Sequence, residues 1–252
     1  MSGLLWNLYA HCYDRIVELV PYQEMLDEVV TALQVSPGMR VLDAGCGTGA
    51  LAERLAARCP DIELVAVDRS PSMLKVARTR RAWPASFKFV EGGIDDVLAG
   101  DEFGYDRIAS VNVIWTLPDP QSTLMNMTSR LRGGGRMVHT TPSWRFRAPA
   151  ILWRHLCGRK GWGRLRALLG LPVLALAGIL NLILVVQSMV LARAPRARKR
   201  WHADGLAELL RAAGAPPRTV SPCYAGQNLL LVCEKEDADR RATRLPVPGE
   251  HL

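Results

Sequence analysis

A glycine-rich stretch between an apolar run and a helical pattern is the segment of this 252-residue sequence best suited to chemistry. It reads VLDAGCGTGALAERLA (residues 41–56) and carries glycines at Gly45, Gly47 and Gly49. Glycines let the backbone approach a ligand closely, and the N-terminus of the following helix offers unpaired N–H groups. Read through Ala50 as G-x-G-x-x-A, the string also satisfies a dinucleotide-binding fingerprint. The glycines alone therefore leave the ligand undecided.

Two carboxylates narrow the choice of ligand. Asp43 lies two residues before the first glycine, where it would repel a pyrophosphate and favour an ammonium or sulfonium group. Asp68 closes the next apolar run, 19 residues after Gly49, a spacing typical of a carboxylate that binds ribose hydroxyls. An adenosine-containing cation without phosphates fits both acids. The sequence therefore predicts S-adenosyl-L-methionine as the cofactor.

The elements around these residues alternate between strands and helices. Apolar runs predict strands at 39–45, 62–68, 87–92, 105–113 and 135–141, and helical patterns cover 49–59, 70–82 and 120–131. One or two amphipathic helices precede them within residues 4–34, broken near Pro21. A helix over 201–215 and a strand pair around residues 225–227 follow them. This alternation predicts an α/β fold with helices on both faces of a mostly parallel sheet.

Five strings carry a family resemblance: VLDAGCGTG, VAVDRSPSML, FVEGGIDDV, YDRIASVNVIWTLPDP and LRGGGRMVHTTP. Their order resembles that of class I S-adenosylmethionine-dependent methyltransferases, and most of all the small-molecule group that includes quinone-biosynthesis enzymes (methyltransferase type 11). The resemblance is strong over residues 39–143 and weaker over 201–235. It implies methyl transfer on a Rossmann-like sheet of seven strands, mostly parallel, with an antiparallel last strand.

The resemblance and the pattern of predicted elements together divide the chain into five parts. Residues 1–38 are expected to form an N-terminal helical lid, and residues 39–143 the cofactor-binding core. Residues 144–200 are an inserted basic and hydrophobic helical cap. Residues 201–235 complete the core with a helix and the strand pair, and residues 236–252 are expected to be a disordered tail.

The resemblance also assigns roles to individual residues. It implies cofactor contacts at Asp43, Gly45, Cys46, Gly47, Asp68, Arg69, Met73, Ile94, Asp95 and Asn112. Among these, Asp43 would orient the amino group, Asp68 would hold the ribose and Met73 would pack on the adenine. Gly93 stands where the family often has an acid, so the adenine contact falls to Asp95 or to the Ile94 backbone. Acceptor contacts are expected at Tyr9, Tyr22, Trp115 and Asn181.

A general base is needed only where the acceptor must lose a proton, because a sulfonium leaving group is already activated. The candidates are His139, His11 and Tyr13. A neutral strand histidine with a structural role is the alternative for His139. For Tyr9, Tyr13 and Tyr22 the alternatives are a lid packed over the cofactor and plain core packing. Nothing in the sequence has the spacing of a metal site or of a Ser-His-Asp arrangement.

The charge of the chain is local. The net charge of +8 arises because residues 120–203 hold 15 basic residues and no acidic one. This block contains residues 167–192, 26 residues without a charge, flanked by arginines. The run is long enough to cross a bilayer, but both of its ends must return to one sheet, and Pro172 and Gly178 leave pieces too short for two crossings. Three interpretations of this run remain: a cap over the acceptor pocket, contact with a membrane surface, and a contact within a homodimer.

The sequence therefore predicts a cytoplasmic methyltransferase, peripheral at a membrane where the cap contacts lipid, acting on a lipophilic small molecule. Six cysteines without metal spacing suit a reducing compartment, and the first residues do not have the pattern of a signal peptide. No nucleic-acid recognition motif accompanies the basic block. Two alternatives stay open: a nucleotide-binding oxidoreductase, and a non-catalytic membrane-associated protein that keeps the cofactor fold.

Overall fold

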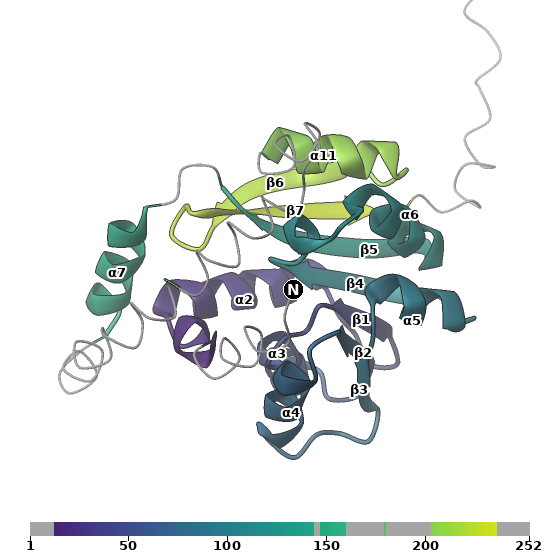
Figure 1. The fold of residues 1–252 in the computed structure, drawn as a ribbon, viewed down its shortest axis with the longest axis horizontal. Helices are drawn as coiled ribbons and strands as arrows, with labels where there is room; N and C mark the ends of the chain where they lie inside the picture. Colours follow the sequence, from purple (N-terminus) through teal and green to yellow (C-terminus); the bar gives the residue numbers. More distant parts are fainter. Residues whose placement is uncertain (1–12, 144–146, 160–178, 180–202, 236–252) are drawn as a thin grey trace, which may run out of the picture.

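A single mixed sheet organises the chain (Figure 1). The computed structural model describes residues 13–143, 147–159, 179 and 203–235, and in this part seven strands pair in the order β3-β2-β1-β4-β5-β7-β6. The strands are β1 (Arg40–Ala44), β2 (Glu63–Asp68), β3 (Phe87–Glu91), β4 (Tyr105–Val111), β5 (Leu131–Pro142), β6 (Pro217–Cys223) and β7 (Asn228–Glu234). The first five pair in parallel, and β7 runs antiparallel to both β5 and β6. The predicted fold class is confirmed.

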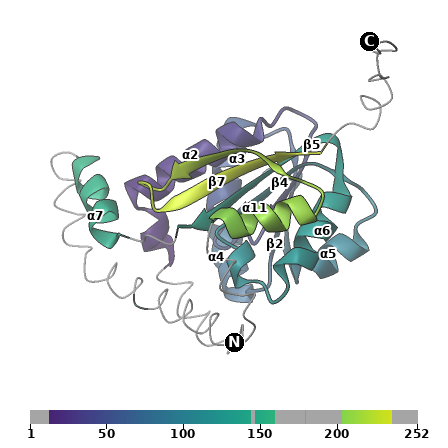
Figure 2. The ribbon, with the colours of Figure 1, turned by 90° about the horizontal axis from the view of Figure 1, so that it is seen from above.

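Helices cover both faces of the sheet (Figure 2). One apolar cluster joins the sheet to α2 (Val20–Leu33), α3 (Ala50–Arg58) and α4 (Pro71–Thr79). The other joins the opposite face to α5 (Ile94–Gly100), α6 (Pro120–Arg130) and α11 (Ala203–Ala212). A short 3-10 helix, η1 (Ile114–Thr116), follows β4, and α7 (Ala148–Cys157) follows β5. The two faces together bury the core of a three-layer sandwich.

Side-chain caps set the starts of two helices, α4 and α6. Ser70 precedes α4 and its side chain accepts a hydrogen bond from the Met73 amide, while Pro71 occupies the first turn. Asp119 caps α6 in the same way by accepting from the Ser122 amide. Both caps lie at the carboxyl edge of the parallel strands, so they fix where each chain segment leaves that edge.

The strand order places the predicted carboxylates at one edge. In a doubly wound sheet, ligands bind outside the carboxyl ends of the strands where the strand order reverses, here between β1 and β4. Asp43 of β1 pairs in register with Ala66 of β2 and Ala109 of β4. Asp68 is the last residue of β2 and pairs with Glu91. Topology alone thus brings the two acids to adjacent strand ends.

Two elements differ from the predictions. The fifth strand begins at Leu131, before the glycines that suggested a loop, because Leu131 pairs with Tyr105 and the Gly134 amide bonds to the Lys235 carbonyl. The helix α5 was not predicted, since its seven residues are too few to show a helical period. Only Ile94 and Leu98 of α5 are buried.

The described start of the predicted insertion lies against the N-terminal helix. In α7, Ile151 is buried in the same cluster as α2, and the Nδ1 of His155 accepts a hydrogen bond from the Val20 amide. Arg154 forms an ion pair with Glu24 on α2 at 2.5 Å. The rest of the predicted cap lies outside the described residues, except for Ile179. No helix in residues 13–143, 147–159 and 203–235 has the length and apolar character that spanning a membrane requires.

Candidate functional site

The turn between β1 and α3 is pressed against its neighbours. Gly45, Gly47 and Gly49 all have positive φ (+81°, +53° and +80°), which L-residues with side chains rarely adopt. The amides of Gly45 and Cys46 both donate to the Val67 carbonyl at 2.8 and 2.9 Å. A Cβ added at Gly45 would lie 2.4 Å from a methyl carbon of Val113. The glycines are therefore needed for a turn that leaves its backbone close to the strand ends.

Asp43 is the most unusual group at this edge. Asp43 is 1% exposed, and within the described part of the chain its buried Oδ2 has no hydrogen-bond partner. Burial, with a smaller contribution from the nearby Asp68 carboxylate, raises the pKa of Asp43 to about 7. A buried carboxylate in this state favours a cationic partner strongly. The position therefore fits the ammonium group of a methionine moiety.

Asp68 is held in place by the backbone. Its Oδ2 accepts from the Gly47 amide at 2.9 Å and its Oδ1 accepts from the Ser70 amide at 2.8 Å. Burial raises its pKa, while these amide bonds and Arg69 act in the opposite direction. Each carboxylate oxygen keeps a second lone pair, so both can still accept from ribose hydroxyls. Met73 is buried one turn into α4, and Arg69 is exposed.

A cavity of about 260 Å³ lies where the adenine is predicted to bind. Its lining includes Arg69, Gly93, Ile94, Asp95 and Leu117. The carboxylate of Asp95 is already engaged, because it accepts from the Thr123 hydroxyl at 2.6 Å and from the Asn126 amide at 2.8 Å. These two bonds join α5 to α6. Each Asp95 oxygen keeps a second lone pair, as in Asp68, so Asp95 and the Ile94 backbone both remain candidates for the adenine contact.

Asn112 is fixed at the end of β4 in a left-handed conformation with φ of +58°. Its Oδ1 accepts from the Asn228 side chain at 2.7 Å and from the Thr140 hydroxyl at 3.2 Å. Its backbone amide donates to the Thr140 carbonyl. With the oxygen occupied, the side-chain NH₂ is the group that Asn112 can offer a ligand. Sequence reasoning missed Asn228 and Thr140, because they come from strands far along the chain.

Three tyrosines form a chain of edge-to-face contacts beside the turn. Tyr13 packs on Tyr22, and Tyr22 packs on Tyr224 in the β6–β7 turn. The hydroxyls of Tyr13 and Tyr22 are 2.6 Å apart and hydrogen-bonded. Burial raises the pKa of Tyr13 to about 12, so its hydroxyl keeps its proton at neutral pH. The role of Tyr13 as a base stays a prediction.

His139 lies inside the sheet. It pairs in register with Ser110 of β4 and Leu231 of β7, and it is fully buried with no hydrogen-bond partner at either ring nitrogen. Burial lowers its pKa to about 4. A side chain closed off from solvent has no path for a proton to an acceptor. The structural interpretation of His139 therefore fits better than that of a general base.

Of the remaining predicted residues, two lie in the described part of the chain and three lie outside it. Cys46 is buried in the turn, and burial raises the pKa of its thiol well above the ordinary value, so it is no nucleophile. Trp115 is partly buried in η1, beyond Asn112. Tyr9, His11 and Asn181 lie outside the described residues, and their roles stay predictions.

The comparisons with known proteins agree with this site. Residues 35–165, just over half of the chain, match the profile of a methyltransferase domain family, and the chain belongs to this family of class I, S-adenosylmethionine-dependent methyltransferases. The ubiquinone biosynthesis O-methyltransferase of Xylella fastidiosa (strain 9a5c) is 33% identical over 105 residues, covering 41% of this chain and 42% of that protein. The chain spans about half or less of the length of the curated relatives it matches.

Solved structures show the same fold at low identity. One chain of the complex between the Haloferax volcanii Trm112 methyltransferase activator and a putative methyltransferase has a TM-score of 0.63 at 16% identity, covering 92% of this chain and 97% of that chain. The magnesium protoporphyrin IX methyltransferase of Synechocystis PCC 6803, solved with S-adenosylhomocysteine, has a TM-score of 0.56 at 18% identity, covering 86% and 84%. The family assignment speaks against the oxidoreductase alternative and supports S-adenosylmethionine as the cofactor.

Ligand binding at Asp43 should depend on pH. Because the pKa of Asp43 is raised to about 7, the carboxyl group is protonated below that pH and loses its attraction for an ammonium group. We expect the affinity for S-adenosylhomocysteine to fall about tenfold per pH unit below about pH 7, as measured by calorimetry from pH 8 to pH 5.5. The Asp43→Asn variant should bind weakly with little pH dependence. An affinity in the unaltered protein that does not change with pH would contradict the assignment.

Replacing His139 with leucine should leave cofactor binding intact and stabilise the protein in acid. Since the pKa of His139 is lower in the folded chain than its ordinary 6.5, the unfolded chain binds more protons between pH 6.5 and pH 4. Folding stability then falls as the pH drops, by up to about 3 kcal/mol. Denaturant unfolding at pH 8 and pH 5 should show this extra loss in the unaltered protein but not in His139→Leu. Intact cofactor binding with lost methyl transfer in the variant would instead support a catalytic histidine.

Proposed function

We propose that this chain transfers the methyl group of S-adenosylmethionine to a lipophilic small molecule. The observation that carries the proposal is the buried Asp43 carboxylate, whose Oδ2 has no hydrogen-bond partner beside the glycine turn. A pyrophosphate at this edge would meet two carboxylates, Asp43 and Asp68, whereas an amino acid ammonium group would neutralise one of them. When bound, S-adenosylmethionine supplies a methyl group activated by a positively charged sulfur.

The residues of the chain contribute orientation more than bond-breaking chemistry. Asp43 and Asp68 would hold the two ends of the cofactor, and the Asn112 side-chain NH₂ would fix the methionine end. Holding an acceptor in line at close range supplies several kcal/mol of the rate acceleration. Burial raises the pKa of Tyr13 and lowers that of His139, and His11 lies outside the described residues, so the identity of any base stays a prediction.

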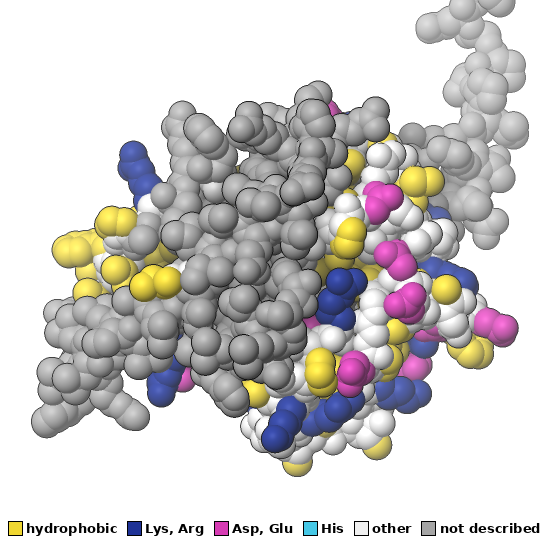
Figure 3. Space-filling view, in the orientation of Figure 1, with side chains coloured by type: hydrophobic (Ala, Val, Ile, Leu, Met, Phe, Trp, Pro, Cys, Tyr) yellow, Lys and Arg dark blue, Asp and Glu magenta, His cyan; other side chains and the backbone are white. Residues whose placement is uncertain are grey.

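The lipophilic character of the acceptor rests on the segment that follows β5. Its sequence contains the 26-residue uncharged run at 167–192. Its described part, α7, buries Ile151 against α2 but leaves Trp153 72% exposed. Figure 3 shows hydrophobic side chains gathered over this part of the molecule. An exposed tryptophan next to arginines suits an apolar ligand or the surface of a bilayer.

A partition experiment tests the function directly. We expect protein incubated with methyl-labelled S-adenosylmethionine and a lipid extract of its host to put label into the organic phase, because the acceptor is lipophilic. Asp68→Ala is the control, and it should lose transfer together with cofactor binding while remaining folded. Label only in the aqueous phase would contradict a lipophilic acceptor. Cofactor binding without transfer to any fraction would favour the non-catalytic binding protein.

Membrane-surface contact through α7 is a separate proposal. Sedimentation with vesicles of phosphatidylglycerol and phosphatidylcholine should pull down the protein, because an anionic surface attracts the basic block and accepts the Trp153 ring. Trp153→Ala should weaken this binding. Phe103→Ala is the matched control, since Phe103 is similarly exposed (68%) but follows α5, outside this block. Equal binding by both variants, or no binding to anionic vesicles, would contradict the proposal.

A further inference from the structure

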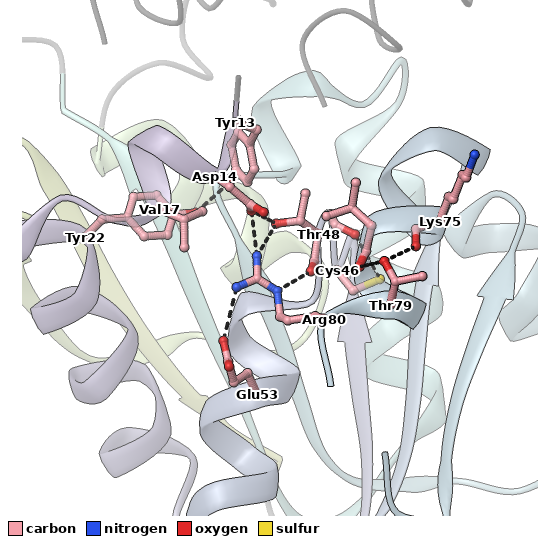
Figure 4. A network of polar contacts seen from close by, with 12 residues as sticks. Tyr13, Asp14, Val17, Tyr22, Cys46, Thr48, Glu53, Lys75, Thr79 and Arg80 are labelled. Atoms are coloured by element: carbon pink, nitrogen blue, oxygen red, sulfur yellow. Dashed lines mark hydrogen bonds and ion pairs between the residues drawn. The ribbon is translucent and has the colours of Figure 1, made fainter. Parts of the chain in front are cut away.

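Arg80 connects four parts of the chain that are separate in sequence (Figure 4). It stands at the C-terminal cap of α4, with a side chain only 16% exposed. Its guanidinium donates to the Thr48 carbonyl at 2.8 Å, to Glu53 of α3 at 3.1 Å and to Asp14 at 2.5 Å. Asp14 belongs to a helical segment at residues 13–17 that precedes α2. One arginine therefore joins α4, the glycine turn, α3 and the N-terminal segment.

Thr48 is the point of the turn that this contact fixes. It lies between Gly47 and Gly49 and is fully buried. Its hydroxyl donates to Asp14 at 2.6 Å and accepts from Arg80 at 3.1 Å, so Thr48 is held through both its backbone carbonyl and its side chain. A turn made largely of glycine has little conformational preference of its own. The contacts of Thr48 thus select one conformation for it.

Asp14 also sets the position of Tyr13. A Cβ placed on Gly47 would lie 3.7 Å from the Tyr13 ring. The ring therefore covers the turn at Gly47, the residue whose amide donates to Asp68. With this segment in place, Asp43 is 1% exposed. Tyr13 lies close enough to Asp43 and Asp68 for both carboxylates to raise its pKa, so this segment stands beside both acids. The segment is held on its outer side by a partly exposed ion pair, which water can replace at small cost.

We infer that Arg80 is a positioning residue and that, together with Asp14, it forms a latch that holds Tyr13 over the glycine turn and must open to admit and release the cofactor. This inference rests on the proposed function, because it takes the ligand of the turn to be S-adenosylmethionine. Neither residue touches the reacting atoms. Their effect is on the rates at which the ligand enters and leaves.

Stopped-flow binding of S-adenosylhomocysteine tests the latch. We expect Asp14→Asn and Arg80→Met to raise both the association and the dissociation rate constants about fivefold, because the segment opens more often. Arg80→Lys keeps the charge pair with Asp14 and should recover part of the slow kinetics. The double variant should be no faster than the faster single variant, since both changes remove the same contact.

A matched control separates latch opening from general damage. Arg132 at the start of β5 pairs with Asp106 at the start of β4 at 2.7 Å, at the sheet edge opposite the glycine turn. Arg132→Met should leave both rate constants unchanged. A purely structural role of Arg80 would lower the melting temperature without speeding association. Variants that melt earlier but bind at the unaltered rates would overturn the latch.

Failure of the proposed function would look different. If the unaltered protein does not bind S-adenosylhomocysteine, the proposed function fails, and hydrogen exchange of the ligand-free protein then tests the latch. Amides of residues 13–17 should exchange at least about fivefold faster in Asp14→Asn than in Arg132→Met. Equal exchange in the two variants would overturn the latch independently of any ligand.

Discussion

The confinement of two carboxylates at neighbouring strand ends is the constraint on which this site depends. Asp43 and Asp68 lie close to the ends of β1 and β2, and the parallel register brings them together. Because both are negative when ionised, each raises the free energy of ionising the other. The chain relieves Asp68 with two backbone amides, from Gly47 and Ser70. Asp43 receives no such donor at Oδ2. The left-handed glycines follow from this, because only a sharp turn can return the Gly47 amide to Asp68.

The site is stabilised from elements outside the first strands. On one side, Arg80 at the end of α4 holds Thr48 and Asp14. On the other, Asn228 of β7 and Thr140 of β5 hold the side chain of Asn112, whose left-handed backbone asparagine adopts more readily than most residues. The antiparallel β7, which distinguishes this sheet from a fully parallel one, thus supplies a hydrogen bond at the ligand edge. Fold and site are coupled through that strand.

Much of this arrangement could be predicted from the sequence, and the rest could not for definable reasons. Asp43, Asp68 and the glycines are readable because a strand end, a turn and a helix start lie within a few residues of each other. The partners of Asn112 and the latch of Asp14 with Arg80 depend on contacts between residues 28 to 116 positions apart. Asp95 shows the same limit, since its bonds to Thr123 and Asn126 arise from the packing of α5 on α6. Local pattern identifies strand ends, whereas tertiary packing decides which side chains remain free.

Asp43 and His139 show that an unpaired buried polar group can be interpreted only together with its position in the fold. Both are almost completely buried, both lack partners, and burial shifts the pKa of each toward its neutral form. Asp43 lies one residue before the end of β1, beside a turn that a movable segment covers. His139 lies three residues inside β5, between Ser110 and Leu231 on the face packed by α6 and α11.

The proposed opening of the 13–17 segment would let a ligand reach Asp43, whereas His139 lies within the sheet, between its paired neighbours Ser110 and Leu231. The raised pKa of Asp43 corresponds to up to about 4 kcal/mol against the charged form in the free protein. A bound cation removes that penalty, so the missing hydrogen bond becomes part of the affinity for the ligand. An internal donor to Oδ2 would stabilise the free chain, but it would also compete with the ligand for the same lone pairs. The absence of such a donor at Asp43 is thus consistent with binding, and the same absence at His139 is only a loss of stability.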